Sequence, residues 1–211
     1  MLTAIHAIIF DFGGVLVDWD PRYLYQRYFP GQSQVVHNFL AETRFAEWNL
    51  EQDKGRPFAE AVASLSADFP QYAPLIHAYW EHWEDSIIGT IDGSISILHS
   101  LKQAGYALYG LSNWSAETFP IAYRKYDFFK LFDDIILSGA VKLVKPDPAI
   151  FELTLRRIRR PASECLLIDD SAANIDTARR LGFKAIRFQS SGQLETELSN
   201  LQLLKPPRWE E

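Results

Sequence analysis

The sequence predicts an α/β fold, in which a parallel β-sheet is covered by helices on both faces and an all-helical segment is inserted after the first strand. Residues 5–10 are apolar except for His6 and lead into Asp11, which is typical of a short strand buried on both faces. From about residue 91 to residue 188, strand and helix patterns alternate, which indicates right-handed crossovers in a parallel sheet. Between these parts, residues 20–85 show helical spacing and no convincing strand.

The first strand ends at a carboxylate. Asp11 is therefore expected at the carboxyl end of a central strand, where open parallel sheets bind their ligands. Gly13 and Gly14 allow a sharp turn and leave backbone amides bare, which suits an anion or a metal ion. A capping aspartate before an ordinary glycine turn fits these three residues equally well. The other segments decide between the two interpretations.

The inserted segment carries three helix signals. Asp20 and Pro21 form an N-cap followed by a first-turn proline, and Pro57 precedes a second run of apolar residues at helical spacing. Residues 72–84 form a third, aromatic-rich candidate helix. We expect most of the nearby tryptophans in a helix-bundle core and one or two at a pocket. They are Trp19, Trp48, Trp80 and Trp83.

The later elements follow in order. A helix over 93–104 ends at Gly105, and a strand over 106–111 leads into Ser112 and Asn113. The remaining expected elements are a strand at 134–137, a helix from Asp147 to about 158, a strand at 164–168, a helix over 174–181 and a strand at 184–188.

Composition limits the possible functions. The 211 residues carry a net charge of −6, which gives no electrostatic reason to bind nucleic acid or an anionic membrane. A single cysteine excludes an internal disulfide framework and a multi-cysteine zinc site. We find neither a signal-like start nor a run of membrane-span length, and we expect a cytoplasmic protein. The oligomeric state stays open.

Polar residues gather where the predicted strands end. Asp11, Ser112 and the pair Asp169–Asp170 each follow a strand, and Lys145 lies in a loop beyond another. Each alone fits a turn, a helix cap or a solvated charge, but their coincidence at one edge indicates phosphoryl transfer. A carboxylate can attack phosphorus only if a divalent cation, a lysine and hydrogen-bond donors relieve the repulsion between two anions.

The residues take separate roles in this interpretation. Asp11 supplies the nucleophilic oxygen and one ligand for Mg²⁺, and Asp170 supplies the opposing ligand. Ser112 and the backbone amides near Gly13, Gly14 and Asn113 hold phosphate oxygens, and Lys145 offsets the developing charge. Asn174 orients the carboxylate pair, of which Asp169 is the inner member, instead of binding metal.

Four motifs in this order resemble the haloacid dehalogenase-like hydrolase superfamily. They are Asp11-Phe12-Gly13-Gly14-Val15-Leu16, Leu111-Ser112-Asn113, Lys145-Pro146-Asp147-Pro148-Ala149-Ile150-Phe151 and Ile168-Asp169-Asp170-Ser171-Ala172-Ala173-Asn174-Ile175. The resemblance is to subfamily I with a helical C1-type cap. It implies a Rossmann-like core domain of residues 1–17 and 89–211, a mobile cap domain of residues 18–88, an aspartyl-phosphate on Asp11 and dependence on Mg²⁺.

The chain departs from the family pattern at one position. Phosphatases of this superfamily usually carry a second aspartate two residues after the nucleophile, as proton donor and acceptor, and here that residue is Gly13. The carbonyl of Gly13 can still bind the metal, and a branch that resembles glucose-1-phosphate phosphatases also has glycine there. The candidates for a substitute donor are Asp18, Asp20, Asp53 and Arg56, which the sequence does not rank.

The sequence therefore favours a Mg²⁺-dependent phosphatase of a small phosphorylated metabolite that resembles a sugar phosphate. The first alternative is a 2-haloacid dehalogenase. Those enzymes typically have an aromatic residue at the position of Gly13 and need no paired-carboxylate metal site, so Asp169 and Asp170 argue against that chemistry. The second alternative is a non-catalytic member that binds a phosphorylated ligand or a partner protein.

Overall fold

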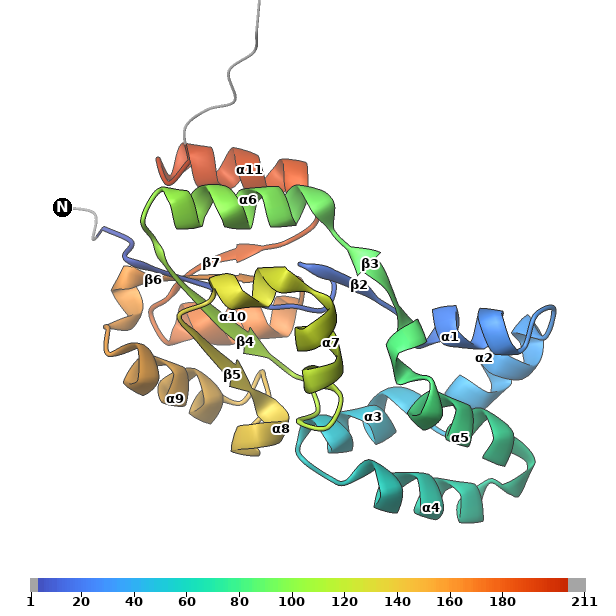
Figure 1. Ribbon diagram of the computed structural model, residues 1–211. Coiled ribbons are helices and arrows are strands. Elements are labelled where there is room, and N and C mark those ends of the chain that lie inside the picture. Colours follow the sequence, from blue (N-terminus) through green and yellow to red (C-terminus); the bar gives the residue numbers. More distant parts are fainter. Residues whose placement is uncertain (1–3, 205–211) are drawn as a thin grey trace, which may run out of the picture.

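Five parallel strands form the central sheet of the computed structural model, which describes residues 4–204 (Figure 1). Their order is β5-β4-β1-β6-β7, so β1 is the middle strand and pairs with β4 and β6. The strands are β1 (Ala7–Phe10), β4 (Ala107–Ser112), β5 (Asp134–Leu137), β6 (Cys165–Asp169) and β7 (Lys184–Arg187). Because every pair is parallel, all five carboxyl ends lie at one edge of the sheet.

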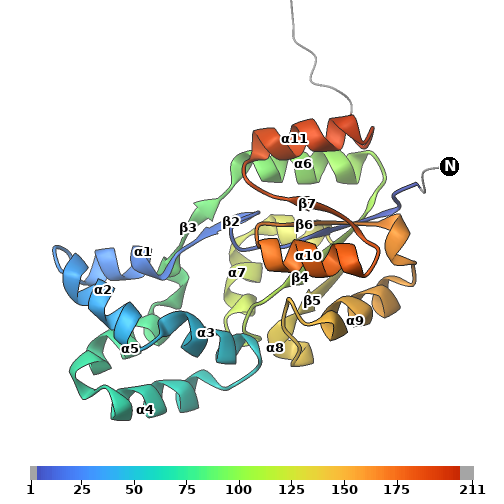
Figure 2. The ribbon, with the colours of Figure 1, turned by 180° about the vertical axis from the view of Figure 1, so that it is seen from behind.

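Helices cover both faces of this sheet (Figures 1 and 2). One face carries α6 (Asp92–Gln103), α7 (Phe119–Lys125) and α11 (Ser191–Asn200), and the other carries α9 (Pro148–Ile158) and α10 (Ala172–Arg180). Alternate residues of β1 serve the two cores, because Ile8 and Phe10 belong to the first cluster and Ile9 to the second. This arrangement confirms the predicted fold class.

The core elements lie close to their predicted positions. The strand at 134–137 and the helix ending at residue 158 have the expected bounds, and the Asp147 side chain caps that helix by accepting from the Ala149 N–H at 2.9 Å. The other predicted core strands and helices begin and end within two residues of the expected positions, whereas α7, α8 (Ser138–Val141) and α11 were not predicted. Local capping and apolar runs were therefore sufficient signals for the predicted elements but not for these three helices.

Five α-helices, not the three expected, lie between the first and third strands. They are α1 (Pro21–Tyr28), α2 (Ser33–Glu42), α3 (Phe45–Asp53), α4 (Phe58–Asp68) and α5 (Ala73–Glu81). The sequence did not reveal α2 and α3, since neither has a side-chain cap and α3 follows Arg44 in a left-handed conformation with φ 48°. The third predicted helix extends beyond the end of α5, where the chain forms a 3₁₀ turn, Trp83–Ser86.

A short antiparallel pair joins the inserted helices to the rest of the chain. It consists of β2 (Val17–Trp19) and β3 (Ile87–Thr90), and the sequence predicted neither strand. Both are too short for an alternating pattern to stand out, and their register shifts between Asp18 and Trp19. No helix among residues 4–204 has both the length and the apolar character needed to cross a membrane.

Candidate active site

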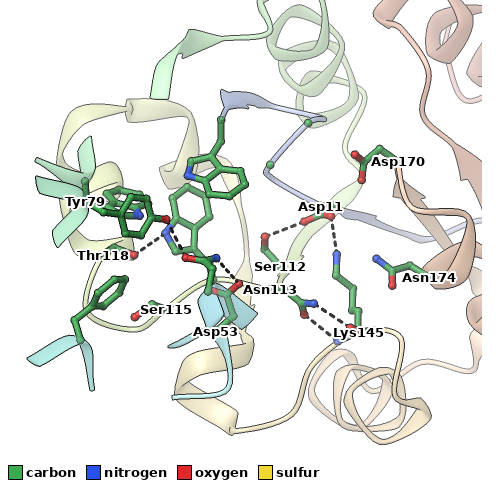
Figure 3. A pocket seen from close by; sticks show the side chains of 17 residues that line it. Asp11, Asp53, Tyr79, Ser112, Asn113, Ser115, Thr118, Lys145, Asp170 and Asn174 are labelled. Carbon is green, nitrogen blue, oxygen red and sulfur yellow. Dashed lines mark hydrogen bonds and ion pairs between the residues drawn. The ribbon is translucent and has the colours of Figure 1, made fainter. Parts of the chain in front are cut away.

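Asp11 directly follows the middle strand β1, and its carboxylate is buried and hydrogen-bonded on both oxygens. The backbone N–H of Phe12 donates to Oδ1 at 2.7 Å, and Ser112 Oγ, from the end of β4, donates to the same oxygen at 2.8 Å. The Nζ atom of Lys145 lies 2.8 Å from the other oxygen, Oδ2 (Figure 3). The carboxylate is therefore held in a single orientation.

Asn113 positions the segment that carries Lys145. Its Nδ2 donates to the carbonyl oxygen of Lys145 at 2.9 Å, and its Oδ1 accepts from the Lys145 N–H at 2.8 Å. This reciprocal pair ties the end of β4 to the loop that precedes α9. The sequence predicted that the backbone amide near Asn113 binds a phosphate oxygen. The side chain is engaged with Lys145 and leaves that backbone amide as the group predicted to bind substrate.

Lys145 joins two carboxylates. Its side chain is only 1% exposed, and Nζ donates to Asp169 Oδ2 at 2.6 Å as well as pairing with Asp11. Burial lowers the pKa of Lys145, but the charges of Asp11 and Asp169 outweigh it and the net shift is upward. Burial raises the pKa of Asp11, with Lys145 opposing and Asp169 adding to that shift. The ammonium therefore stays protonated between the two carboxyl groups.

Asp169, the last residue of β6, is fully buried behind Lys145. Asn174 Nδ2 donates to its two oxygens at 2.9 and 3.1 Å, and the Ser171 N–H donates to Oδ1 at 2.9 Å. The carboxylate is thus satisfied without solvent and supports the lysine. Asn174 contacts only Asp169 of the predicted carboxylate pair, and its role in orienting the pair stays a prediction.

Asp170 has its carboxylate near the glycine turn. Gly14 has φ +71°, and a Cβ at that residue would lie 2.7 Å from Asp170 Oδ2, so only glycine fits. Asp11, Asp169 and Asp170 each offer a carboxylate oxygen, and these three atoms lie within 4.8 Å of one another. Burial and the Asp169 charge raise the pKa of Asp170, so a bound cation would favour its ionised form. A group made only of oxygen donors fits Mg²⁺.

A cavity of about 380 Å³ opens between this edge of the sheet and the inserted helices (Figure 3). Its floor contains all the predicted site residues except Asp169, which lies behind them. These lining residues are Asp11, Gly13, Gly14, Ser112, Asn113, Lys145, Asp170 and Asn174. A volume of this size is ordinary for a small-molecule site. The structure therefore brings the four sequence motifs to one cavity.

Most of the remaining cavity wall was not predicted from the sequence, apart from the candidate donor Asp53 and the expectation of one or two tryptophans. Aromatic rings dominate it, namely Trp19, Phe58, Tyr79, Trp83 and Trp114. Polar groups between the rings come from Asn49, Asp53, Ser115 and Thr118. Trp114 and Ser115 directly follow the second motif, which was the only available signal. The helical residues depend on how five helices pack, although Trp19 and Trp83 fulfil the expectation that one or two tryptophans line a pocket.

The structure separates the four candidates for a proton donor. Asp53 lines the cavity, whereas the other three side chains are engaged elsewhere. Asp18 accepts from Tyr23 Oη at 3.0 Å, Asp20 caps α1 and pairs with Arg22, and Arg56 donates to Gln52 Oε1 at 2.8 Å.

Comparison with known proteins gives matches along most of the chain. The family model described as "haloacid dehalogenase-like hydrolase" matches residues 5–182. The chain is 28% identical to the drimenol cyclase drtB of Aspergillus calidoustus, a match that covers 93% of this chain but 36% of that protein. The chain therefore spans about a third of the length of that relative.

Another relative matches from end to end. The sesquiterpene phosphatase astK of Aspergillus oryzae is 26% identical, and the match covers 95% of this chain and 98% of the relative. Proteins named as (S)-2-haloacid dehalogenases are also related. Among solved structures, a family enzyme of Bacteroides thetaiotaomicron in complex with magnesium and inorganic phosphate has a TM-score of 0.71 at 22% identity, covering 89% of this chain and 96% of that one.

Proposed function

Since the chain belongs to the haloacid dehalogenase-like hydrolases, we propose that it is a Mg²⁺-dependent phosphatase that acts on a small phosphorylated metabolite through an aspartyl-phosphate on Asp11. One observation carries the proposal. A protonated lysine is locked against the Asp11 carboxylate by a second, fully buried carboxylate, at the floor of a cavity. This arrangement supplies a nucleophile together with positive charge for an incoming phosphate.

The chain's own residues account for the first step. The Phe12 N–H, Ser112 and Lys145 hold the two oxygens of Asp11, so little rotational freedom is lost when the carboxylate attacks phosphorus. Lys145 also neutralises charge that develops on the phosphoryl oxygens. Asp169 keeps that lysine charged and in place, and Asn174 keeps Asp169 in place.

Asp11, Asp170 and the Gly13 carbonyl are the residues that we assign to the metal. A bound Mg²⁺ would supply the positive charge that lets a carboxylate approach a phosphate ester. The cluster of carboxylate oxygens supports this assignment, and the solved enzyme with magnesium and phosphate has the same fold.

We assign the cap to residues 18–88 and the core domain to residues 1–17 and 89–211. The side chains on the cap side of the cavity help to determine which substrate class fits. On that side, Tyr79 Oη donates to Asn49 Oδ1 at 2.9 Å, and in the adjoining core segment Trp114 Nε1 donates to Thr118 Oγ1 at 3.1 Å. Few groups remain for the hydroxyls of a sugar phosphate, the class expected from the sequence.

A monophosphate ester of an apolar alcohol is a second candidate substrate class. Five aromatic rings line the cavity, and burying an apolar group against them is favourable. The relative named as a sesquiterpene phosphatase supports this class as well. We favour the apolar ester over the sugar phosphate for this reason.

Dehalogenation is the main rival activity, because it would use the same Asp11 to displace halide from carbon and dehalogenases are among the relatives. It gives no role to the clustered carboxylates, which therefore favour phosphoryl transfer. A binding function without turnover likewise leaves the fixed nucleophile without a use.

The test is phosphate release from sugar phosphates, isoprenyl monophosphates and p-nitrophenyl phosphate, with and without Mg²⁺, beside chloride release from 2-chloropropionate. We expect Mg²⁺-dependent phosphate release that is lost in Asp11→Asn, with the highest kcat/KM for an isoprenyl ester. Metal-independent chloride release would identify a dehalogenase instead. A purified protein that binds phosphate esters without any turnover would contradict an enzymatic role.

A further inference from the structure

We infer that Asp53, at the C-terminal end of α3, is the catalytic acid that protonates the leaving alcohol and then the base that accepts a proton from the attacking water. This inference rests on the proposed phosphatase function. It assigns to the cap a chemical step that the core side of the site leaves without a residue.

The core side offers no suitable acid among the described residues that line the cavity. Asp11 is the nucleophile, Lys145 is committed to two carboxylates, and Asp170 belongs to the carboxylate cluster. At Gly13, where the related phosphatases carry an acid, an added Cβ would meet no atom within 4 Å. The space beside the nucleophile is therefore open to the cavity, whose opposite wall carries Asp53.

Asp53 is the cavity-lining carboxyl group that these roles do not use. It stands on the helical side of the cavity and Asp11 on the sheet side, with the cavity between them (Figure 3). Asn49 Nδ2 donates to its Oδ2 at 3.3 Å, and the backbone N–H of Ser115 also hydrogen-bonds to the carboxyl group. These donors come from α3 and from the loop after β4, so both sides of the cavity orient the group.

The backbone around Asp53 is anchored to the core. Ser138 Oγ, at the start of α8 (Ser138–Val141), donates to the carbonyl oxygen of Asp53 at 2.5 Å. Two residues further on, Gly55 has φ +99°, and a Cβ there would lie 2.9 Å from the Gly139 carbonyl oxygen. The end of α3 therefore packs directly against α8, which fixes the position of the carboxyl group.

The environment suits a group that both gives and takes a proton. Burial raises the pKa of Asp53 to about 7, the Ser115 N–H opposes that shift, and the charge of Asp11 adds to it. The buried Tyr79 hydroxyl is the other titratable group that interacts with it. Near neutral pH, both protonation states of Asp53 are thus populated, which is the condition for efficient acid–base catalysis.

The two steps balance. In the first, an Asp11 oxygen bonds to phosphorus, the ester P–O bond breaks, and the Asp53 proton moves to the leaving oxygen to give the alcohol. In the second, water attacks phosphorus, its proton moves to the Asp53 carboxylate, and the bond between phosphorus and Asp11 breaks to release phosphate. Asp53 ends protonated, as it began.

The experiment compares Asp53→Asn with wild type on an alkyl phosphate, whose leaving group needs a proton, and on p-nitrophenyl phosphate, whose leaving group does not. We expect kcat for the alkyl ester to fall about 100-fold or more. With p-nitrophenyl phosphate we expect a burst of nitrophenol near one per enzyme, because the phosphoenzyme still forms but is hydrolysed slowly. Asp18→Asn, the same change outside the cavity, is the matched control and should show neither effect.

The double variant Gly13→Asp with Asp53→Asn gives a second test. An aspartate side chain at residue 13 has space in the cavity. We expect it to restore at least a tenth of the activity on the alkyl ester that Asp53→Asn loses. Equal losses on both esters without a burst, in a variant with wild-type melting behaviour at pH 5, would overturn the role of Asp53 while leaving the phosphatase intact. A wild-type protein that neither releases phosphate nor forms a phosphoenzyme with either ester would overturn the proposed function itself.

Discussion

The two walls of the cavity are built by different means. The core wall places charged groups at or near the ends of parallel strands, and Asp11, Lys145 and Asp169 are held by polar contacts that join the motifs. On the opposite side, Asn49, Asp53, Phe58 and Tyr79 come from inserted helices whose positions depend on mutual packing, and these residues make up the helical wall. In the proposed mechanism, the core wall carries the charge needed for phosphoryl transfer, while the helical wall selects the substrate and supplies its proton.

The largest expected effect comes from removing the proposed nucleophile, which belongs to the core wall. We expect Asp11→Asn to lower kcat by more than about 10⁴-fold, because Asp11 is the cavity carboxylate that Ser112 and Lys145 hold in place as the proposed nucleophile. Lys145 keeps its bond to Asp169 in this variant, so the fold should survive. Phosphate release and thermal unfolding measure the two effects, and an active variant would exclude the covalent route.

Lys145→Met tests the electrostatic character of the core wall. It leaves Asp169 fully buried beside neutral donors, which should cost about 3–5 kcal/mol of unfolding free energy. We also expect a loss of about 10²–10³-fold in kcat. Lys125→Met, at an exposed residue, is the matched control and should leave both quantities near wild type. A variant as stable as the control in urea denaturation would mean that the ion pair does not organise this wall.

Asp53 should make the free energy of unfolding depend on pH. Its folded pKa of about 7 lies above the unfolded value of 3.8, so the folded state binds more protons between these values and its stability falls as pH rises through this window. Asp53→Asn removes this loss of stability at high pH. In metal-free protein it should raise the unfolding free energy at pH 8 by up to about 4 kcal/mol and change it little at pH 4.

Asp11 and Tyr79 interact with the same carboxyl group and are present in both proteins, so the difference between the two measures the titration of Asp53 together with its coupling to these neighbours. Unfolding curves of wild type and variant between pH 4 and pH 8 measure the difference. A constant difference across that range would show that Asp53 titrates normally.

The smallest expected effect concerns the aromatic rings. Phe58 lies in the cavity wall and stacks on Trp80 with centroids 4.6 Å apart. We expect Phe58→Leu to raise KM for an isoprenyl monophosphate by about tenfold, since aromatic packing contributes about 0.5–1.5 kcal/mol. Tyr123→Leu, at an exposed ring outside the cavity, is the control. Equal KM values for the two variants would remove the apolar ester as the favoured substrate.

The same contrast explains how much the sequence could predict. Apolar runs in the sequence predicted the strands. Their ends carry Asp11, Ser112 and Asp169. Because the carboxyl ends of parallel strands share one sheet edge, the sequence also predicted that these residues lie close together. The sequence assigned only the backbone amide near Asn113 to the substrate, and it gave no role to the side chain, whose contact with Lys145 depends on a loop 32 residues away.

The sequence did not predict which helical residues line the cavity, for a related reason. Asp53 belongs to α3, whose start has no cap signal, and its approach to the cavity depends on Ser138 and the close contact between Gly55 and Gly139. The sequence could name Asp53 among four candidates but not rank it. Tyr79 and Phe58 likewise fit a helix core and a cavity wall equally well until five helices are packed together.

Direct detection of the intermediate tests the central claim. The protein is mixed with p-nitrophenyl phosphate and Mg²⁺, quenched in acid, digested and analysed by peptide mass spectrometry. The account predicts one phosphoryl group on the peptide that contains Asp11, absent without metal and absent in Asp11→Asn, with more of it in Asp53→Asn. Phosphate release by the wild type with no phosphoryl group on that peptide, even in Asp53→Asn, would contradict it.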